Sequence, residues 1–152
     1  MDTRIGGKTM IKTITCCVDF SENAGKAFEK ALEISEKFKA KLHVIHVLPP
    51  VVNPLAANGE WVIPEERDKS WVLKVEERLQ EEYGSRIPGG TEFELVVLDG
   101  HVSSEIIEFL KKSKSDLVIM GSYGTSGMGL VIFGSVAKRI AHRAPCSVMI
   151  VR

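Results

Sequence analysis

The chain has 152 residues, of which 44% are hydrophobic and 26% charged, enough apolar content for one domain with its own core. Twenty Lys and Arg residues balance twenty Asp and Glu residues, so no net field favours nucleic acid or an anionic membrane. The three cysteines form no CxxC pair, and no apolar run approaches the roughly 20 residues that cross a bilayer. These features argue against a disulfide scaffold, a zinc-stabilised domain and a membrane span, and we expect a cytoplasmic protein.

Five short apolar runs, in chain order, predict five strands. They are Thr13–Val18, Leu42–Leu48, Phe93–Leu98, Asp116–Met120 and Cys146–Val151. Apolar residues at helical spacing predict a helix after each of the first four strands. The expected start and stop signals are Ser21 as the first N-cap, Pro64 with Glu65-Glu66 opening a second helix that ends near Gly84, Ser103 or Ser104 capping the third, and Pro145 stopping the fourth.

Strands that are nearly continuously apolar and alternate with helices predict an α/β fold. With right-handed crossovers this is a three-layer, doubly wound, Rossmann-like domain with a five-stranded parallel sheet. The irregular segment Val51–Pro64 is expected to be a surface loop. Ligands of such sheets bind beyond the carboxyl ends of the strands, where the strand order reverses. Asp19 and the segment Gly121–Ser135 would meet there if the first and fourth strands flank that point.

The segment Gly121–Ser135 contains five glycines and neither Lys nor Arg. It fits neither the Walker A motif nor the dinucleotide pattern G-x-G-x-x-G. Gly121 and Gly124 can take backbone angles denied to other residues and bring main-chain N–H groups close to a ligand. Gly134 and Ser135 open the last helix, whose positive end suits phosphate. The alternative is a surface loop in which the glycines only turn the chain.

The spacing Gly121-x2-Gly124-x9-Gly134-Ser135 resembles the G-x2-G-x9-G-[ST] pattern of the ATP-binding branch of the universal stress protein family. The resemblance extends over nearly the whole chain. VDFSENAGKAFEKAL at Val18–Leu32 is similar to the first strand and helix of that family, and GSVAKRIAHRAPCSVMIVR at Gly134–Arg152 to its ending. We therefore expect residues 1–10 to be an N-terminal extension and residues 11–152 to be the family domain.

The resemblance implies that the chain binds ATP, or AMP or ADP, with or without Mg²⁺, as a nucleotide-dependent switch in a stress response. It places Asp19 near the adenosine and the backbone of Val47 on adenine. The resemblance also implies that six residues surround the ribose and phosphates: Met120, Gly121, Gly124, Gly134, Ser135 and Val136. It also implies a homodimer formed by antiparallel pairing of the last strand, Cys146–Val151. Such pairing would cover an apolar edge strand.

Two other functions remain open at this point. The first is slow Mg-dependent ATP hydrolysis with a divalent ion near Asp19, for which the sequence offers no general base. The second is a nucleotide-independent interaction module that uses the Val51–Pro64 loop. His43 and His46 lie three residues apart in one strand, so they point to opposite faces and form no simple metal pair.

Overall fold

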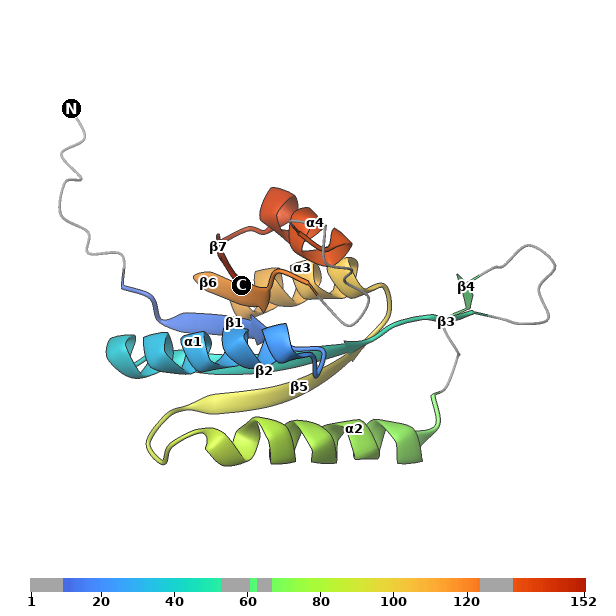
Figure 1. Ribbon diagram of the computed structural model, residues 1–152, viewed down its shortest axis with the longest axis horizontal. Coiled ribbons are helices and arrows are strands. Elements are labelled where there is room, and N and C mark those ends of the chain that lie inside the picture. The colour runs from blue at the N-terminus through green and yellow to red at the C-terminus, as the bar shows by residue number, and fades with distance from the viewer. Residues whose placement is uncertain (1–9, 53–60, 63–66, 124–132) are drawn as a thin grey trace.

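The computed structural model describes residues 10–52, 61–62, 67–123 and 133–152. Five parallel strands form one sheet in the order β5-β2-β1-β6-β7 (Figure 1). Their bounds are β1 Thr13–Cys17, β2 Lys41–Leu48, β5 Phe93–Asp99, β6 Leu117–Gly121 and β7 Ser147–Val151. The strand order reverses between β1 and β6. The doubly wound parallel sheet, with its first and fourth strands flanking the switch point, is therefore confirmed.

Helices cover both faces of this sheet (Figure 1). Their bounds are α1 Glu22–Phe38, α2 Lys69–Glu82, α3 Val102–Ser113 and α4 Ser135–Arg143, with a short 3-10 helix η1 at Gly84–Arg86. One apolar cluster joins the sheet to α1 and α2, and a second joins it to α3 and α4. The predicted three-layer arrangement is confirmed.

The two clusters explain why the central strands carry apolar residues on both faces. Cys16 packs with Phe28 of α1, whereas its neighbour Cys17 packs with Ile106 of α3 and Ile140 of α4. Successive side chains of a strand point to opposite faces, so a strand covered on both sides has no polar face. Each large side chain buried in this way contributes about 1.5–3 kcal/mol to the hydrophobic stabilisation of the fold.

The cysteines behave as small apolar residues. Cys16 and Cys17 are buried and Cys146 is half-buried, and none forms a disulfide. Burial raises the pKa of the Cys17 thiol to about 12 and that of Cys16 well above its ordinary value. Both therefore remain protonated and unreactive near neutral pH.

The first helix begins as predicted. The hydroxyl oxygen of Ser21 accepts a hydrogen bond from the backbone N–H of Ala24 at 3.2 Å, which makes Ser21 the N-cap of α1. The helix ends at Phe38, because Lys39 takes a left-handed conformation with φ 56° and donates its N–H to Ser35 O. A left-handed residue at this position closes the helix.

The start of the second helix differs from the prediction. Arg67 and Asp68 are not helical, and α2 begins at Lys69 rather than at Pro64, which lies outside the described residues. Asp68 is the N-cap, and its Oδ1 accepts from Ser70 N at 2.9 Å. An aspartate at this position satisfies a free helix amide, which proline with two glutamates does not do as directly.

Two further details correct the expectations from the sequence. The N-cap of α3 is His101, whereas Ser103 and Ser104 lie inside the first turn of the helix. The segment expected to be irregular contains a two-stranded antiparallel ladder, β3 Val51–Val52 with β4 Trp61–Val62. Two-residue strands are too short to produce a sequence period.

Candidate functional site

Three of the predicted site residues lie at the carboxyl edge of the sheet, at the switch point. Cys17 at the end of β1 pairs with Ile45 in β2 and with Met120 in β6. Asp19 follows Cys17 by two residues, and Val47 follows Ile45 by two residues, so both lie at the level where the strands end. The fold thus brings Asp19, Val47 and Met120 to one edge from three adjacent chain segments.

The start of α4 is tied to the same edge by two backbone hydrogen bonds. Gly134 N donates to Ser122 O at 2.7 Å, and Ser122 N donates to Val151 O at 2.9 Å. The first hydrogen bond within α4 runs from Lys138 N to Gly134 O. The N–H groups of residues 135–137 therefore have no partner within the helix, which is the arrangement that binds anions.

This connection places the remaining predicted residues. Gly134, Ser135 and Val136 form the N-cap and first two positions of α4 beside the end of β6, and Ser135 is exposed. Gly121 ends β6. Gly124, and with it the first half of the proposed glycine spacing beyond Gly121, lies outside the described residues.

Gly121 is required by a close approach rather than by its backbone angles. Its φ is not positive, contrary to the expectation that it uses angles denied to other residues. A Cβ atom at Gly121 would lie 2.9 Å from the Cβ of Asn23 and 3.0 Å from its backbone carbon and oxygen. Only a residue without a side chain lets the first turn of α1 pack directly on the end of β6.

The carboxylate of Asp19 is held by the residue that caps α1. Asp19 Oδ1 accepts hydrogen bonds from Ser21 N at 3.1 Å and from the Ser21 hydroxyl at 2.5 Å. The same hydroxyl oxygen accepts from Ala24 N, so the carboxylate is connected to the N-terminal end of the helix. A negative charge is favourable there, because the helix dipole is positive at its N-terminus.

An aromatic cluster that the sequence does not indicate adjoins Asp19. Phe20 has φ 64°, and its ring centroid lies 4.7 Å from that of His46. His46 donates from Nδ1 to Val18 O at 2.8 Å, and burial lowers the pKa of its ring. The two histidines do point to opposite faces, since His43 contacts the ring of Phe109 in α3.

Arg67 is a second residue that sequence reasoning missed. Its side chain is 6% exposed, and its Nε donates to Asp99 Oδ2 at 2.5 Å. Its Nη2 donates to Leu48 O at 3.3 Å and to Pro49 O. Arg67 therefore joins the carboxyl ends of β2 and β5 to the segment that precedes α2. A lone arginine in a polar stretch gives no signal of this role.

Ser122 is a third residue to which the sequence assigned no role. It lies between Gly121 and Gly124, the first two glycines of the family pattern. Its side chain is fully buried, and within the described part of the chain its hydroxyl has no hydrogen-bond partner. Both backbone groups of Ser122 make the bonds that join β6, β7 and α4. Its place at this junction explains its burial.

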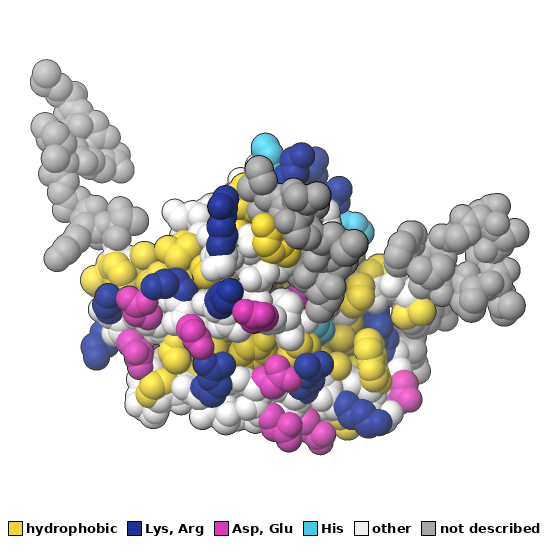
Figure 2. Space-filling model, viewed as in Figure 1, with side chains coloured by type: hydrophobic (Ala, Val, Ile, Leu, Met, Phe, Trp, Pro, Cys, Tyr) yellow, Lys and Arg dark blue, Asp and Glu magenta, His cyan; other side chains and the backbone are white. Residues whose placement is uncertain are grey.

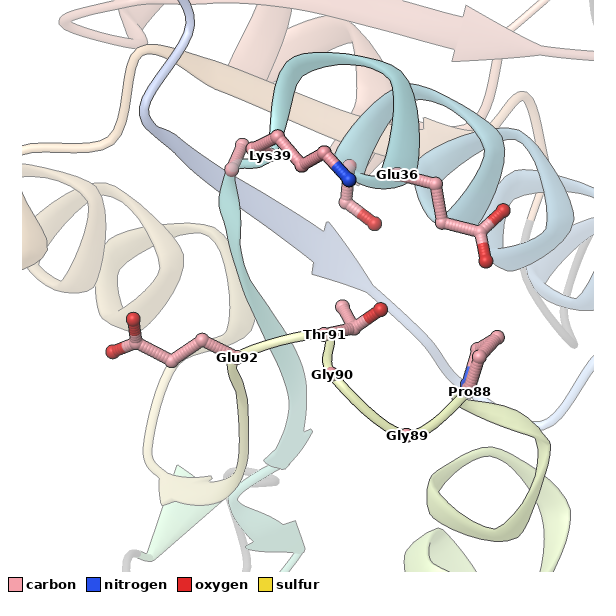
Figure 3. Close-up of a pocket in the computed structure, with 9 residues that line it drawn as sticks. Glu36, Lys39, Pro88, Gly89, Gly90, Thr91 and Glu92 are labelled. Carbon is pink, nitrogen blue, oxygen red and sulfur yellow. The ribbon is translucent and has the colours of Figure 1, made fainter.

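A hollow lies at the opposite, amino edge of the sheet (Figure 3). Its volume is about 420 Å³, and its lining comes from the end of α1 and from the loop before β5. In Figure 3 the carboxylates of Glu36 and Glu92 point to opposite sides, away from one another. No predicted site residue lines this hollow, and its charged groups do not converge on a shared point.

Charge is distributed unevenly over the surface. Figure 2 shows Lys, Arg and His side chains gathered over α4, whereas Asp and Glu lie lower, over α1 and α2, mixed with further Lys and Arg side chains. Helix α4 carries Lys138, Arg139, His142 and Arg143 and no acidic residue. The searched, described residues contain no group of three His, Cys, Asp or Glu that could hold a metal ion. None of the described helices is long and apolar enough to cross a membrane.

The fold and this edge define a doubly wound α/β domain in which a loop and a helix N-terminus meet at the switch point. The sequence model of the universal stress protein family matches residues 10–152. The chain belongs to the universal stress protein family, as its glycine spacing indicated.

Individual relatives agree with this assignment. Universal stress protein MJ0531 of Methanocaldococcus jannaschii is 33% identical over 151 residues, which cover 96% of this chain and 85% of that protein. A universal stress protein of Archaeoglobus fulgidus, solved in complex with dAMP, is similar with a TM-score of 0.66 and 18% identity, covering 93% of this chain and 98% of that one. A universal stress protein solved in complex with cAMP has a TM-score of 0.66 and 20% identity, covering 95% and 98%.

Proposed function

We propose that this chain binds an adenine nucleotide at the carboxyl edge of the sheet, between the Asp19 turn and the N-terminus of α4. The observation that carries the proposal is the Gly134 N to Ser122 O hydrogen bond, which fixes the amides of residues 135–137 beside the switch point. Two universal stress proteins of similar fold were solved with cAMP and with dAMP. Both ligands carry adenine and a phosphate, the groups for which this edge offers complementary chemistry.

Each predicted residue has a distinct part in this proposal. The N–H groups at the start of α4, which have no partner within the helix, and the exposed hydroxyl of Ser135 bind phosphate oxygens. The carboxylate of Asp19 accepts hydrogen bonds from the adenosine. The backbone at Val47 contacts adenine, and Met120, Gly121, Gly124, Gly134 and Val136 surround the ribose and phosphates. No cationic side chain is needed, because backbone amides and the helix dipole supply the positive potential.

ATP is the proposed ligand, with AMP and ADP as alternatives, and occupancy acts as a switch in a cytoplasmic stress response. A triphosphate brings more negative charge than one helix end neutralises, so Mg²⁺ would accompany it, bound mainly by phosphate oxygens. Phosphate release measured with Mg²⁺ present separates a binding protein from a slow hydrolase. A variant Asp19→Asn that hydrolyses at the wild-type rate would remove Asp19 from any hydrolytic mechanism.

Binding is tested by native mass spectrometry of freshly purified protein, followed by calorimetric titration with ATP and AMP. We expect copurified or added adenine nucleotide in a 1:1 complex with the chain. Asp19→Asn and Ser135→Ala should each weaken binding about tenfold, since hydrogen bonds to charged groups contribute about 1.5–3 kcal/mol. Ser104→Ala removes a comparable hydroxyl from the first turn of α3 and should leave the affinity unchanged. Absence of any adenine-nucleotide binding by the wild type would refute the proposal.

We also propose that two copies pair through β7. This strand is the last in the sheet order, and in the described chain it pairs only with β6. An apolar edge strand left uncovered invites pairing with another chain. Sedimentation equilibrium should give twice the 16.8 kDa mass of the chain, and Val148→Lys should shift the protein towards the monomer. A wild type that sediments as a monomer at micromolar concentration would contradict this pairing.

A further inference from the structure

Phe20 has an unusual backbone conformation next to the proposed nucleotide site. Three non-glycine residues among those described have a positive φ: Phe20 at 64°, Lys39 at 56° and Lys114 at 50°. Lys39 and Lys114 are the C-caps of α1 and α3, where a left-handed residue is expected. Phe20 lies instead in the turn between β1 and α1. A bulky side chain rarely takes this conformation, so surrounding contacts must hold it.

The contacts that hold Phe20 come from two other elements. The ring lies against His46 of β2, with centroids 4.7 Å apart, and the guanidinium carbon of Arg78 in α2 lies 4.1 Å from the ring centroid. The ring of Tyr83 lies 6.0 Å away and is itself buried. Aromatic and cation–π contacts of this kind are of the same order as the cost of a left-handed residue, so they can offset it.

The conformation of Phe20 determines where Asp19 lies. Asp19 Oδ1 accepts from both the N–H and the hydroxyl of Ser21, so these hydrogen bonds span Phe20. Turning Phe20 to an extended or right-handed conformation would move Ser21 relative to Asp19 and break at least one of them. The ring is thus connected to the carboxylate through one residue of backbone, while Arg78 connects that ring to α2.

We propose that Phe20 is a positioning residue: its ring, in contact with His46 and Arg78, keeps the chain left-handed so that Asp19 is oriented for the nucleotide. The proposal rests on the proposed nucleotide site and adds a residue to it that makes no assumed ligand contact. The Phe20 ring also connects the site to α2, because the exposed Arg78 of that helix lies over it.

A double-mutant cycle tests this role, with ATP affinity measured by calorimetry and stability by urea unfolding. Phe20→Gly keeps the left-handed backbone accessible but removes the ring, and should weaken ATP binding about tenfold, a coupling typical of neighbouring residues. In the Asp19→Ala background the same change should alter affinity less than about twofold, because Asp19 is no longer there to be oriented. The loss of stability should be similar in both backgrounds. Phe20→Tyr should retain the wild-type affinity.

A pair of arginine variants provides a test that leaves the turn intact if Phe20→Gly does not fold. Arg78→Met removes the cation over Phe20 and should weaken ATP binding about threefold, the size of an exposed cation–π contact. Arg86→Met is the matched control, because Arg86 lies 5.2 Å over the ring of Phe28 and pairs with Glu29, away from Asp19. It should leave ATP affinity unchanged.

The outcomes separate this inference from the proposed function. If the wild type binds no adenine nucleotide, the proposed function fails and the positioning role fails with it. If the wild type binds ATP and Asp19→Ala weakens binding, but Phe20→Gly has no effect or the same effect in both backgrounds, only the positioning role is wrong. Equal effects of Arg78→Met and Arg86→Met would also overturn it.

Discussion

The hollow and the proposed nucleotide site lie at opposite edges of the sheet. The amino edge has an open hollow of about 420 Å³, lined by Gly89, Gly90 and side chains whose charges diverge. The carboxyl edge has a left-handed phenylalanine, a buried serine hydroxyl without a partner among the described residues, and a glycine in contact with a helix. Strain, burial of polar groups and close backbone approach mark the edge where the strand order reverses. Volume alone does not identify a site.

The largest expected effect comes from Arg67 at the carboxyl edge. Arg67→Met should lower the free energy of unfolding by about 3 kcal/mol, because it leaves Asp99 and two backbone carbonyl groups without their charged donor. Urea unfolding measures the change. Lys37→Met, which breaks an exposed pair with Glu33 near the amino edge, should barely move the unfolding midpoint. Similar losses in both variants would mean that the carboxyl edge is not specially constrained.

The glycines of the two edges give a sharper comparison. Gly121→Ala should lower the free energy of unfolding by about 2 kcal/mol and weaken nucleotide binding, since its Cβ would displace Asn23 and the first turn of α1. Gly89→Ala adds the same methyl group where no atom lies within 4 Å, and should change stability by less than about 0.5 kcal/mol. Paired urea denaturation curves measure both values. A tolerated Gly121→Ala would show that the close approach relaxes at little cost.

The smallest expected effect is a change in how stability depends on pH. Both histidines of β2 contribute to this dependence. Burial lowers the pKa of His43 and of His46 below the ordinary value of 6.5. The unfolded chain then binds more protons than the folded one, so the free energy of unfolding should decrease as pH falls below about 6.5. His43→Gln and His46→Asn should each flatten this decrease between pH 7 and 5. An unchanged slope in either variant would exclude that histidine from the effect.

The parts of the fold that follow from local pattern could be predicted from the sequence. Continuous apolar runs predict buried parallel strands, and Ser21 has the chemistry of a helix cap, so β1, α1 and the switch point were predicted correctly. The start of α2 was not, because Pro64 and Asp68 are competing start signals and only the structure shows which one is used. The two-residue strands β3 and β4 carry no period that a sequence could reveal.

The site shows the same division between local and tertiary causes. Gly134 and Ser135 were predicted to open the last helix, which α4 confirms, and the structure adds that Ser122 connects this start to the end of β6. Phe20 could not be predicted, since its conformation opposes its own preference and depends on His46 and Arg78, far away in sequence. The role of Arg67 likewise depends on carbonyl groups that only the folded sheet brings together.

Hydrogen–deuterium exchange with and without ATP tests most directly whether the carboxyl edge is the nucleotide site. Bound nucleotide should slow exchange of amides in residues 18–23, 120–122 and 134–137, which lie at this edge. Exchange in residues 88–92, which line the hollow at the amino edge, should not change. Slower exchange in residues 88–92 with no change at the carboxyl edge would contradict the proposed site.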